Sequence, residues 1–484
     1  MIISVDQSTS ATKALLFDES GNRLHRTNRE HRQYYPQPGW VEHDPEEIFA
    51  STCAVIRELV AETGVTEEQI DCLSITNQRE TVVLWDGESG RPLYNALVWQ
   101  DGRAAAICRE LAAEADMVGA KTGLPLDPYF SAGKVAWAVR NVDVVKTAAT
   151  VGSLRIGTID SWLIYKLTHG AVHATDVSNA CRTLLFDIHQ RKWDADIAAV
   201  FGVPLGALPQ VRASNAEFGR ADADDIGLTL PIRGVAGDSH AALFGQRRFG
   251  TGEGKVTYGT GSSVMVNIGP DPTSPPPGIA LSVGWGLDDE LSYVFEGNVH
   301  ATGDTVRWAV ENLGLASTVE EAAELAYSVE SSDGVMVVPA FAGLGAPYWD
   351  NDARAVICGI TRSTDRRHVL RAVFDSIAHQ VADVLDAMRA GIDVREVSAD
   401  GGPARNRRLM QLQADLCDGS VVVPAVEELS ALGAAFLGGY GTVWRSLDEM
   451  RALPVEATRF TPTMSGADRL SSRAAWRKAI SRTR

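Results

Sequence analysis

Asp238 lies where an apolar segment meets a run of small residues, and its surroundings suit proton transfer. Apolar Ile232 and Val235 before it predict a buried strand, and the small residues at 241–243 predict the start of a helix. Gly237 would let the backbone or phosphate of another molecule approach, so Asp238 is a candidate base for a substrate hydroxyl. Aspartate is also among the best helix N-caps, and that structural role is the alternative interpretation.

A turn near the start of the chain carries a second set of polar side chains. Asp6, Thr9 and Ser10 lie between a short strand predicted at 2–5 and another predicted at 12–17. One carboxylate and two hydroxyls on one turn suit a hydrated Mg²⁺ ion and the terminal phosphate of ATP. Polar hairpin turns are common, so a purely structural turn is the alternative.

Arg79 and Glu80 come directly after an apolar strand predicted at 73–76. A guanidinium beside a carboxylate matches a vicinal diol, because each hydroxyl donates one hydrogen bond and accepts another. A surface ion pair is the alternative. Trp99 and Tyr129 offer aromatic faces for the C–H side of such a polyol, and membership of a hydrophobic core is their alternative role.

The pattern of two strands joined by a polar turn occurs again about 250 residues later, at 255–268. Its turn, at 259–263, is rich in glycine and hydroxyl groups. Two such hairpins predict two similarly folded halves, each presenting backbone amides and hydroxyls to phosphate. We place the boundary near residue 240, which gives domains of 1–240 and 241–484.

Between the hairpins and after them, helices are predicted at 44–62, 319–330 and 368–391, and strands at 335–339 and 421–423. This mixture indicates α/β layers.

Composition limits the classes of partner. The 484 residues are 45% apolar, enough for at least two domains with cores of their own. A net charge of −17 without a large Lys/Arg cluster argues against nucleic acid, so a nucleotide would need amides, hydroxyls and Mg²⁺. The six cysteines lack paired spacing and are expected to be buried in a reducing compartment. With neither a basic leader nor a long apolar run, we expect a cytoplasmic protein without a membrane span.

Several longer segments resemble the FGGY carbohydrate kinases, and within them the glycerol kinases, from end to end of the chain. They are PGWVEHDP at 38–45, NQRET at 77–81, GTIDSWLI at 157–164, NACRT at 179–183, GLGAPYWD at 343–350 and DGG at 400–402. The resemblance implies an α/β fold of two ribonuclease-H-like, actin-like ATPase domains with a central cleft. It also implies ATP-dependent phosphorylation, with Mg²⁺, of a primary hydroxyl of glycerol or a closely related small polyol.

The resemblance also implies roles for individual residues. Asp238 would be the base, Arg79, Glu80 and Tyr129 the polyol clamp, and Trp99 an apolar wall. Gly402 would let the adenine stack on backbone, because no Cβ intervenes. Ser239 would also touch the substrate, Asp6 would lie near Mg²⁺, and ATP would contact Thr9, Ser10, Lys13, Thr260, Gly261, Gly303, Arg307, Gly402 and Asn406.

The chain departs from the family pattern near the substrate. Ser239 stands where these kinases usually have glutamine, and Ser263 where they usually have phenylalanine. The second change removes an apolar lid worth roughly 2 kcal/mol of burial. A roomier, more polar pocket makes a kinase of a tetritol, pentitol or pentulose the alternative function. His240 would either touch that substrate or pack at the helix start, and Arg307 replaces a usual glutamine near the nucleotide.

One alternative belongs to a different class of protein. An actin- or chaperone-like ATPase would use the same fold to bind other proteins. That fold does not require Arg79, Glu80, Trp99 and Tyr129 together, so the four side chains favour the kinase of a small molecule. We expect a homo-oligomer, either a dimer or a tetramer.

Overall fold

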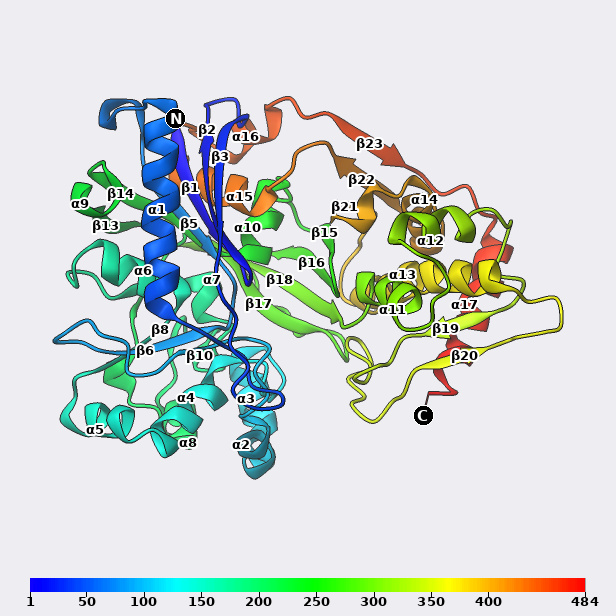
Figure 1. The fold of residues 1–484 in the computed structure, drawn as a ribbon, viewed down its shortest axis with the longest axis horizontal. Coiled ribbons are helices and arrows are strands. Elements are labelled where there is room, and N and C mark those ends of the chain that lie inside the picture. The colour runs from blue at the N-terminus through cyan, green and yellow to red at the C-terminus, as the bar shows by residue number, and fades with distance from the viewer. Residues whose placement is uncertain (484) are drawn as a thin grey trace.

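The computed structural model describes residues 1–483, and two mixed β-sheets organise it (Figure 1). The first sheet has six strands, in which β1 runs antiparallel to β2 and parallel to β5. Its spatial order is β13 (Glu217–Ala221), β14 (Leu230–Gly237), β5 (Leu73–Asn77), β1 (Ile2–Gln7), β2 (Ala11–Phe17) and β3 (Arg23–Glu30).

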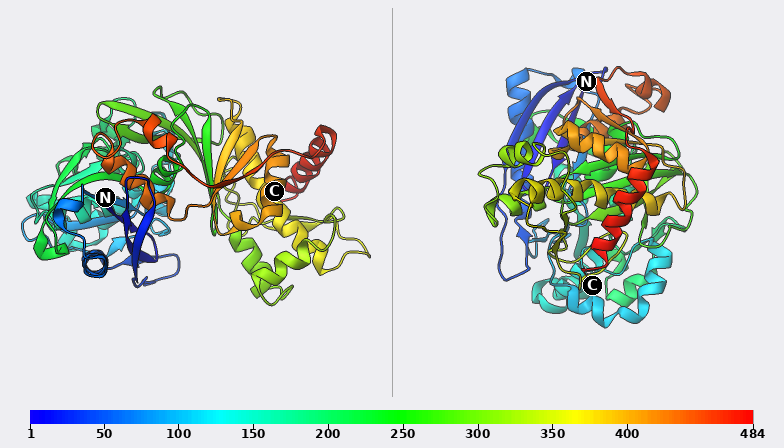
Figure 2. Two further views of the ribbon diagram at one scale, coloured as in Figure 1. Left: turned by 90° about the horizontal axis from the view of Figure 1, so that it is seen from above. Right: turned by 90° about the vertical axis from the view of Figure 1, so that its right-hand side faces the viewer.

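The second sheet repeats this pattern, because β15 runs antiparallel to β16 and parallel to β21. Its spatial order is β17 (Ala280–Leu287), β18 (Glu290–Val299), β16 (Ser262–Gly269), β15 (Glu253–Tyr258), β21 (Glu396–Gly401), β22 (Ser420–Pro424) and β23 (Ala457–Phe460). Both predicted hairpins are therefore confirmed, together with the actin-like, ribonuclease-H-like fold class. Figure 2 shows the two sheets in separate lobes of the molecule.

Long helices cover the sheets. Helix α1 (Pro45–Thr63) packs on the first sheet, and Asp44 caps it by accepting hydrogen bonds from two backbone amides of the first turn. Helix α13 (Arg366–Met388) covers the second sheet. Helix α12 (Val319–Ala326) is shorter than the predicted 319–330. It ends early because the Ser328 hydroxyl and amide both bond to the carbonyl of Leu325, which closes a tight turn.

Two helices join the lobes. Helices α10 (Asp238–Gly245) and α15 (Leu429–Gly439) cross closely: a Cβ on Gly433 would lie 1.8 Å from the Ala241 carbonyl oxygen. Helix α15 also packs on the first sheet, where the Ser4 hydroxyl donates to the Ala431 carbonyl at 2.8 Å. In Figure 1 orange α15 accordingly lies beside blue β1 and green α10. The chain thus returns to the first lobe after residue 428.

Smaller elements complete each lobe. The first lobe adds a four-stranded sheet in the order β4 (Glu42–His43), β7 (Ala96–Leu97), β6 (Val82–Asp86) and β8 (Leu154–Thr158). It also has two strand pairs, β9 (Ala174–Asp176) with β12 (Gln210–Arg212) and β10 (Phe186–Asp187) with β11 (Lys192–Trp193). Its remaining helices are α2 (Ala105–Glu110), α3 (Ala115–Thr122), α4 (Ser131–Asn141), α5 (Asp143–Val151), α6 (Ile159–Leu167), α7 (Val177–Ala180), α8 (Ala195–Phe201) and α9 (Ala223–Ile226). The second lobe adds β19 (Met336–Val338), β20 (Val356–Cys358), α11 (Gly303–Glu311), α14 (Arg407–Cys417) and α17 (Gly466–Ile480). Helix α16 (Leu447–Ala452) follows α15.

Two expectations about composition can be compared with the structure. Among the described residues, no helix combines the length and the apolar character needed to cross a bilayer. All six cysteines are free, but Cys358 is only half-buried, so the prediction that all of them are buried is wrong for this residue. Cys358 lies in β20, which pairs with β19, and packs only partly against a small cluster that includes Val338, Leu344 and Trp476.

Candidate active site

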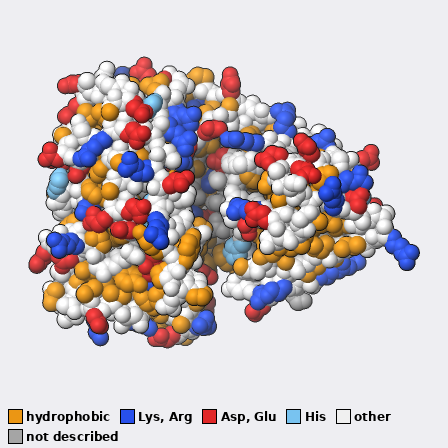
Figure 3. All heavy atoms as spheres, viewed as in Figure 1, with side chains coloured by type: hydrophobic (Ala, Val, Ile, Leu, Met, Phe, Trp, Pro, Cys, Tyr) orange, Lys and Arg blue, Asp and Glu red, His pale blue; other side chains and the backbone are white. Residues whose placement is uncertain are grey.

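Three strands of the first sheet bring the candidate side chains together. Gln7 of β1 and Gly237 of β14 both pair with Asn77 of β5 in parallel register, so the carboxyl ends of the three strands share one edge. Asp238 follows directly on β14, and Arg79 follows β5 by two residues. The edge opens into the hollow between the lobes that Figure 3 shows. Gln7 and Asp238, which are 231 residues apart in the sequence, are thereby gathered at one place, as expected at the carboxyl edge of parallel strands.

Gly237 allows a close approach by the side chain of Arg79. A Cβ at this position would lie 2.6 Å from Cγ and 2.8 Å from Cδ of Arg79. The backbone of Gly237 has a φ of −62°, which any residue can adopt. The glycine therefore makes room for the side chain of Arg79, and the approach of a substrate or phosphate stays a prediction.

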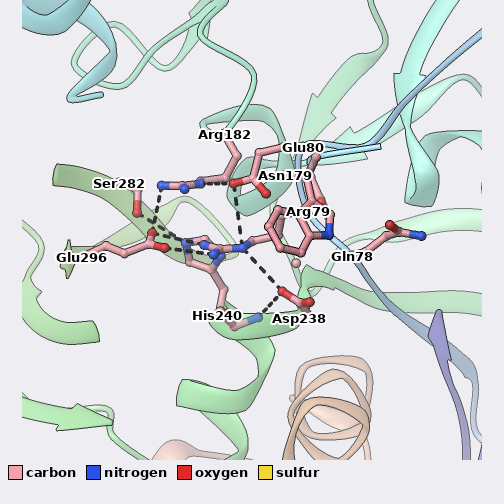
Figure 4. A network of polar contacts seen from close by, with 12 residues as sticks. Gln78, Arg79, Glu80, Asn179, Arg182, Asp238, His240, Ser282 and Glu296 are labelled. Carbon is pink, nitrogen blue, oxygen red and sulfur yellow. Dashed lines mark hydrogen bonds and ion pairs between the residues drawn. The ribbon is translucent and has the colours of Figure 1, made fainter. Parts of the chain in front are cut away.

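A buried network of four charged side chains lies beside Asp238 (Figure 4). Arg79 donates from Nη1 and Nη2 to Glu296 at 3.1 and 2.9 Å. Arg182 donates from Nη1 to Glu296 at 2.8 Å and from Nε to Glu80 at 2.6 Å. Two guanidinium groups and two carboxylates balance, which is how a protein interior tolerates such charges.

The predicted pairing of Arg79 with Glu80 is only partly present. Nε of Arg79 lies 4.0 Å from Oε1 of Glu80, whereas Glu296 and Arg182 provide the hydrogen bonds. Burial opposes the ionisation of Glu296, but the charges of Arg182 and Arg79 outweigh it and hold the pKa of this carboxyl well below its ordinary value. Glu80 has a φ of 61°, a left-handed conformation that a non-glycine residue keeps only where surrounding contacts hold it.

Asp238 is more exposed than the nearby carboxylates of Asp6, Glu80 and Glu296. Its side chain is 38% exposed, and Oδ1 lies 3.4 Å from Nε of Arg79. The backbone N–H of Ser239 donates to the same oxygen at 2.6 Å. One carboxylate oxygen is thus held by the protein, which leaves Oδ2 available for a substrate hydroxyl.

Trp99 and Tyr129 form an aromatic corner next to the network. Their ring centroids are 5.6 Å apart in an edge-to-face arrangement. Burial raises the pKa of Tyr129, and the nearby charge of Glu80 adds to the effect, so the phenol is neutral. Within residues 1–483 the hydroxyl of Tyr129 has no hydrogen-bond partner. The corner therefore offers two ring faces and one free hydroxyl.

At the first hairpin turn, Asp6 is paired with the cation of the same hairpin. Nζ of Lys13 lies 3.3 Å from Oδ2 of Asp6 and 2.7 Å from Oε2 of Glu428, the residue before α15. Burial raises the pKa of Asp6 to about 6; Lys13 counteracts this effect, and Glu428 and Asp238 add to it. Thr9 accepts a hydrogen bond from Nε1 of Trp99 at 3.0 Å, which links this turn to the aromatic corner. Ser10 is exposed.

The second hairpin turn meets the start of helix α11. The amide of Gly303 donates to the Gly259 carbonyl at 3.0 Å. A Cβ on Gly303 would lie 2.5 Å from that carbonyl oxygen, and a Cβ on Gly261 2.4 Å from the carbonyl oxygen of Val299. Thr260 sits between them, with its carbonyl bonded to the amide of Thr302 at 2.9 Å. Glycine is thus required at both 261 and 303 for close backbone packing.

The remaining nucleotide candidates lie farther along the second lobe. Gly402 is exposed, and a Cβ there would meet nothing within 4 Å, so its face is open for a planar group. Oδ1 of Asn406 caps α14 by accepting from the amides of Arg408 and Leu409 at 3.1 Å. Arg307 is exposed on α11 and makes no ion pair with any described residue.

Two of the residues that depart from the family pattern are serines near the candidate site, and a third, His240, is buried. Ser239 is half-buried beside Asp238. Ser263 faces Asn298 across the β16–β18 pair, and its buried hydroxyl has no hydrogen-bond partner in the part of the chain that the structure describes. His240 is 1% exposed and points Nε2 at the Ser282 hydroxyl, 3.4 Å away. Of its two predicted roles, the structure has packing at the helix start.

Sequence reasoning assigned no role to Arg182 or Glu296. Arg182 lies in the NACRT motif at 179–183, but its hydrogen bond to Glu80 depends on the fold. Glu296 does carry a signal: it directly follows the buried apolar run Tyr293, Val294 and Phe295 within β18. A lone carboxylate in a buried strand must find a cation, and this requirement could have identified it.

Comparisons with known proteins agree with this arrangement. The model of the N-terminal domain of the FGGY family of carbohydrate kinases matches residues 1–245, and that of the C-terminal domain matches residues 254–442. The chain is 47% identical to glycerol kinase 1 of Thermotoga maritima over 99% of its length and 98% of that protein. It is 45% identical to the glycerol kinase of Symbiobacterium thermophilum over 100% of its length and 98% of that protein.

Solved structures agree as well. The crystal structure of Plasmodium falciparum glycerol kinase with ADP aligns with a TM-score of 0.94 and 36% identity, over 100% of this chain and 98% of that one. A xylulose kinase from Lactobacillus acidophilus aligns with a TM-score of 0.88, over 100% of this chain and 96% of that one, but at 20% identity this likeness concerns the fold alone. By the matches to both domain models and to full-length relatives, the chain belongs to the FGGY family of carbohydrate kinases.

Proposed function

We propose that the chain is an ATP-dependent kinase that phosphorylates a primary hydroxyl of glycerol or a closely related small polyol. The observation that carries this proposal is the position of Asp238, which is half-exposed at the carboxyl edge of the first sheet and 3.4 Å from Arg79. Relatives that share its full length are named glycerol kinases. The predicted domains, 1–240 and 241–484, would contribute the polyol and phosphate side and the nucleotide side respectively.

In the proposed reaction, Asp238 accepts the proton of the attacking hydroxyl as its oxygen bonds to the γ-phosphorus of ATP and the bond to the β-phosphate oxygen breaks. Glu80 and Arg79 would hold the neighbouring hydroxyl, Tyr129 would bond to the polyol, and Trp99 would cover its C–H face. Ser239 would add a further polar contact. Closure of the lobes would exclude water, which otherwise competes with the polyol for the phosphoryl group.

The nucleotide would lie along the second hairpin turn. Thr9, Ser10 and Lys13 of the first turn and Thr260 and Gly261 of the second would contact phosphates, with Arg307 on α11 close by. Gly303, Gly402 and Asn406 would border the adenine and ribose. Bound Mg²⁺ would offset the charge of the phosphates, and the buried carboxylate of Asp6 fits as its nearest protein group, because Mg²⁺ prefers oxygen ligands.

A longer substrate is the second candidate function, and one observation favours it. The Ser263 hydroxyl is buried without a partner on the sheet face that carries Glu296 and Asn298. Buried polar groups are normally hydrogen-bonded, so an additional hydroxyl of a longer substrate would give the Ser263 hydroxyl a hydrogen-bond partner. A tetritol, a pentitol or a pentulose would supply it.

Release of ADP tests both candidates. The panel consists of glycerol, erythritol, threitol, pentitols, dihydroxyacetone and pentuloses, each with ATP and Mg²⁺. Highest kcat/KM with glycerol supports the first candidate, and highest kcat/KM with a four- or five-carbon compound supports the second. ADP release that none of these compounds stimulates would refute both. We further propose that the protein is cytoplasmic and forms a homo-oligomer, a dimer or tetramer. Sedimentation analysis of the purified protein tests the oligomeric state.

A further inference from the structure

Lys134 is a lysine whose charged end is buried against backbone. It lies one turn into α4, its side chain is inaccessible to solvent, and Nζ donates to the carbonyl oxygens of Pro128 and Tyr129 at 2.6 and 2.7 Å. The carbonyl oxygen of Phe130 is 3.4 Å away. An ammonium group has three N–H donors, so these three carbonyls use all of them.

Stability alone would not select a cation at this place. Within residues 1–483, no carboxylate comes within ion-pair distance of Lys134. The amino end of a helix also disfavours a positive charge. Burial accordingly lowers the pKa of Lys134 to about 8, although Asp101, Glu80 and Asp127 oppose the shift. Where a local rule is broken in this way, a functional reason is expected nearby.

The turn that Lys134 holds presents the aromatic corner. Oδ1 of Asp127 accepts from the amide of Tyr129 at 2.8 Å, so the turn is tied at its start. The hydroxyl of Ser131 donates to the carbonyl of Glu80 at 2.7 Å, which ties its end to the charged network. Between these two ties, Lys134 is the only group among residues 1–483 that donates to the carbonyls at 128–130. The ammonium therefore determines the backbone conformation from which Tyr129 projects towards Trp99.

We propose that Lys134 is a positioning residue for polyol binding, acting through Tyr129. This inference rests on the proposed role of Tyr129 in the polyol clamp. With the carbonyls of 128–130 bound to Nζ, the backbone on both sides of Tyr129 cannot rotate, and the phenol stays ordered before substrate arrives. Preorganisation of this kind raises affinity because binding no longer has to order the side chain. The nucleotide side of the cleft is not involved.

A double-mutant cycle tests the inference on the full-length enzyme. K134M keeps the length of the side chain and removes its three donors, Y129A removes the phenol, and K134M/Y129A combines them. The quantities are kcat, KM for the best polyol of the panel and KM for ATP. K166M is the matched control, since Lys166 pairs with Glu46 at 3.0 Å on the surface of another helix.

We expect K134M to raise the polyol KM at least tenfold while the ATP KM stays within twofold of the wild type. Y129A should raise the polyol KM by a similar factor, and the double variant should raise it no further. K166M should leave both KM values unchanged. If K134M does not fold, K134Q, which retains two donors, should give an intermediate polyol KM with an unchanged ATP KM.

Three results would overturn the role of Lys134. They are an unchanged polyol KM in K134M and K134Q, equal losses for polyol and ATP, and multiplicative losses in K134M/Y129A. The last two would indicate a general structural role. A Y129A variant with wild-type polyol kinetics would refute the assignment of Tyr129 to the clamp, and with it the inference. Absence of polyol phosphorylation by the wild type would refute the proposed function as well.

Discussion

Arg79 and Glu296 join the two lobes through a pair of hydrogen bonds of 2.9 and 3.1 Å, although they are 217 residues apart in the chain. Arg79 follows a strand of the first sheet, and Glu296 lies on β18 of the second. Both are at most 5% exposed. The guanidinium that lies 3.4 Å from Asp238 is therefore oriented by a residue of the opposite lobe.

The E296Q variant should lose both stability and polyol turnover. It leaves the guanidinium groups of Arg79 and Arg182 with one carboxylate between them, and breaking a buried charge pair typically costs about 3–5 kcal/mol. Denaturant unfolding and kcat/KM measure the two losses. The double variant R182M/E296Q restores charge balance and should be less destabilised than the sum of its single variants. Strict additivity would contradict the network.

The G237A variant should disturb Arg79 without straining the backbone. Its new Cβ would lie 2.6 Å from Cγ of Arg79, so the guanidinium must move away from Glu296 and Asp238. Misplacement by about 1 Å costs up to 10²-fold in rate, and we expect kcat/KM to fall at least tenfold. G206A is the matched control, because a Cβ there meets nothing within 4 Å. Equal activity of the two variants would contradict the packing argument.

Asp160 should make stability depend on pH. It is fully buried, accepts from the hydroxyls of Thr158 and Thr175 at 2.5 and 2.7 Å, and burial together with the charge of Asp176 raises its pKa to about 7. Between pH 4 and 7 the folded state keeps a proton that the unfolded state releases, so stability falls as pH rises through this window. One pKa unit corresponds to about 1.4 kcal/mol, which makes the contribution on the order of a few kcal/mol.

The D160N variant carries no such proton. Its unfolding free energy should decline less than that of the wild type between pH 4 and 7, as chemical denaturation at several pH values would measure. Parallel curves for the two proteins would show that Asp160 is ionised throughout.

Ser239 and Ser263 should influence the preferred length of the substrate. S239Q/S263F fills the space near the fourth carbon and adds apolar contact, and one methylene is worth about 1–3 kcal/mol of discrimination. The ratio of kcat/KM for glycerol to that for the best four- or five-carbon substrate should rise about tenfold or more. A ratio that does not change, or a wild type that already strongly prefers glycerol, would mean that the serines do not set substrate length.

Patterns local in sequence predicted much of the fold. Short apolar runs joined by polar turns located both hairpins, and Asp44 followed by Pro45 located the start of α1. The pairing of Arg79 and Arg182 with Glu296 could not be predicted in the same way, because it depends on how two sheets dock. The burial of Lys134 was hidden for a similar reason: its partners are carbonyls, which no side-chain pattern reports.

The packing of α15 on the first lobe could not be predicted from the sequence either. Helix α15 lies on the first sheet because Gly433 and Gly245 allow it to cross α10 closely. Glycines in a helical segment announce close packing but do not identify the partner. The roles proposed for Thr260, Gly402 and Asn406 stay predictions that nucleotide-binding measurements on variants can test.

The most direct test of the central claim is phosphotransfer by the D238N variant. Asparagine keeps the size of the side chain but cannot accept the proton, and loss of a general base typically costs about 10²- to 10⁴-fold in rate. We predict that polyol-dependent ADP formation falls by this factor while the dissociation constant for ATP stays within twofold of the wild type. Turnover above half of the wild-type value would contradict the assignment of Asp238 as the base.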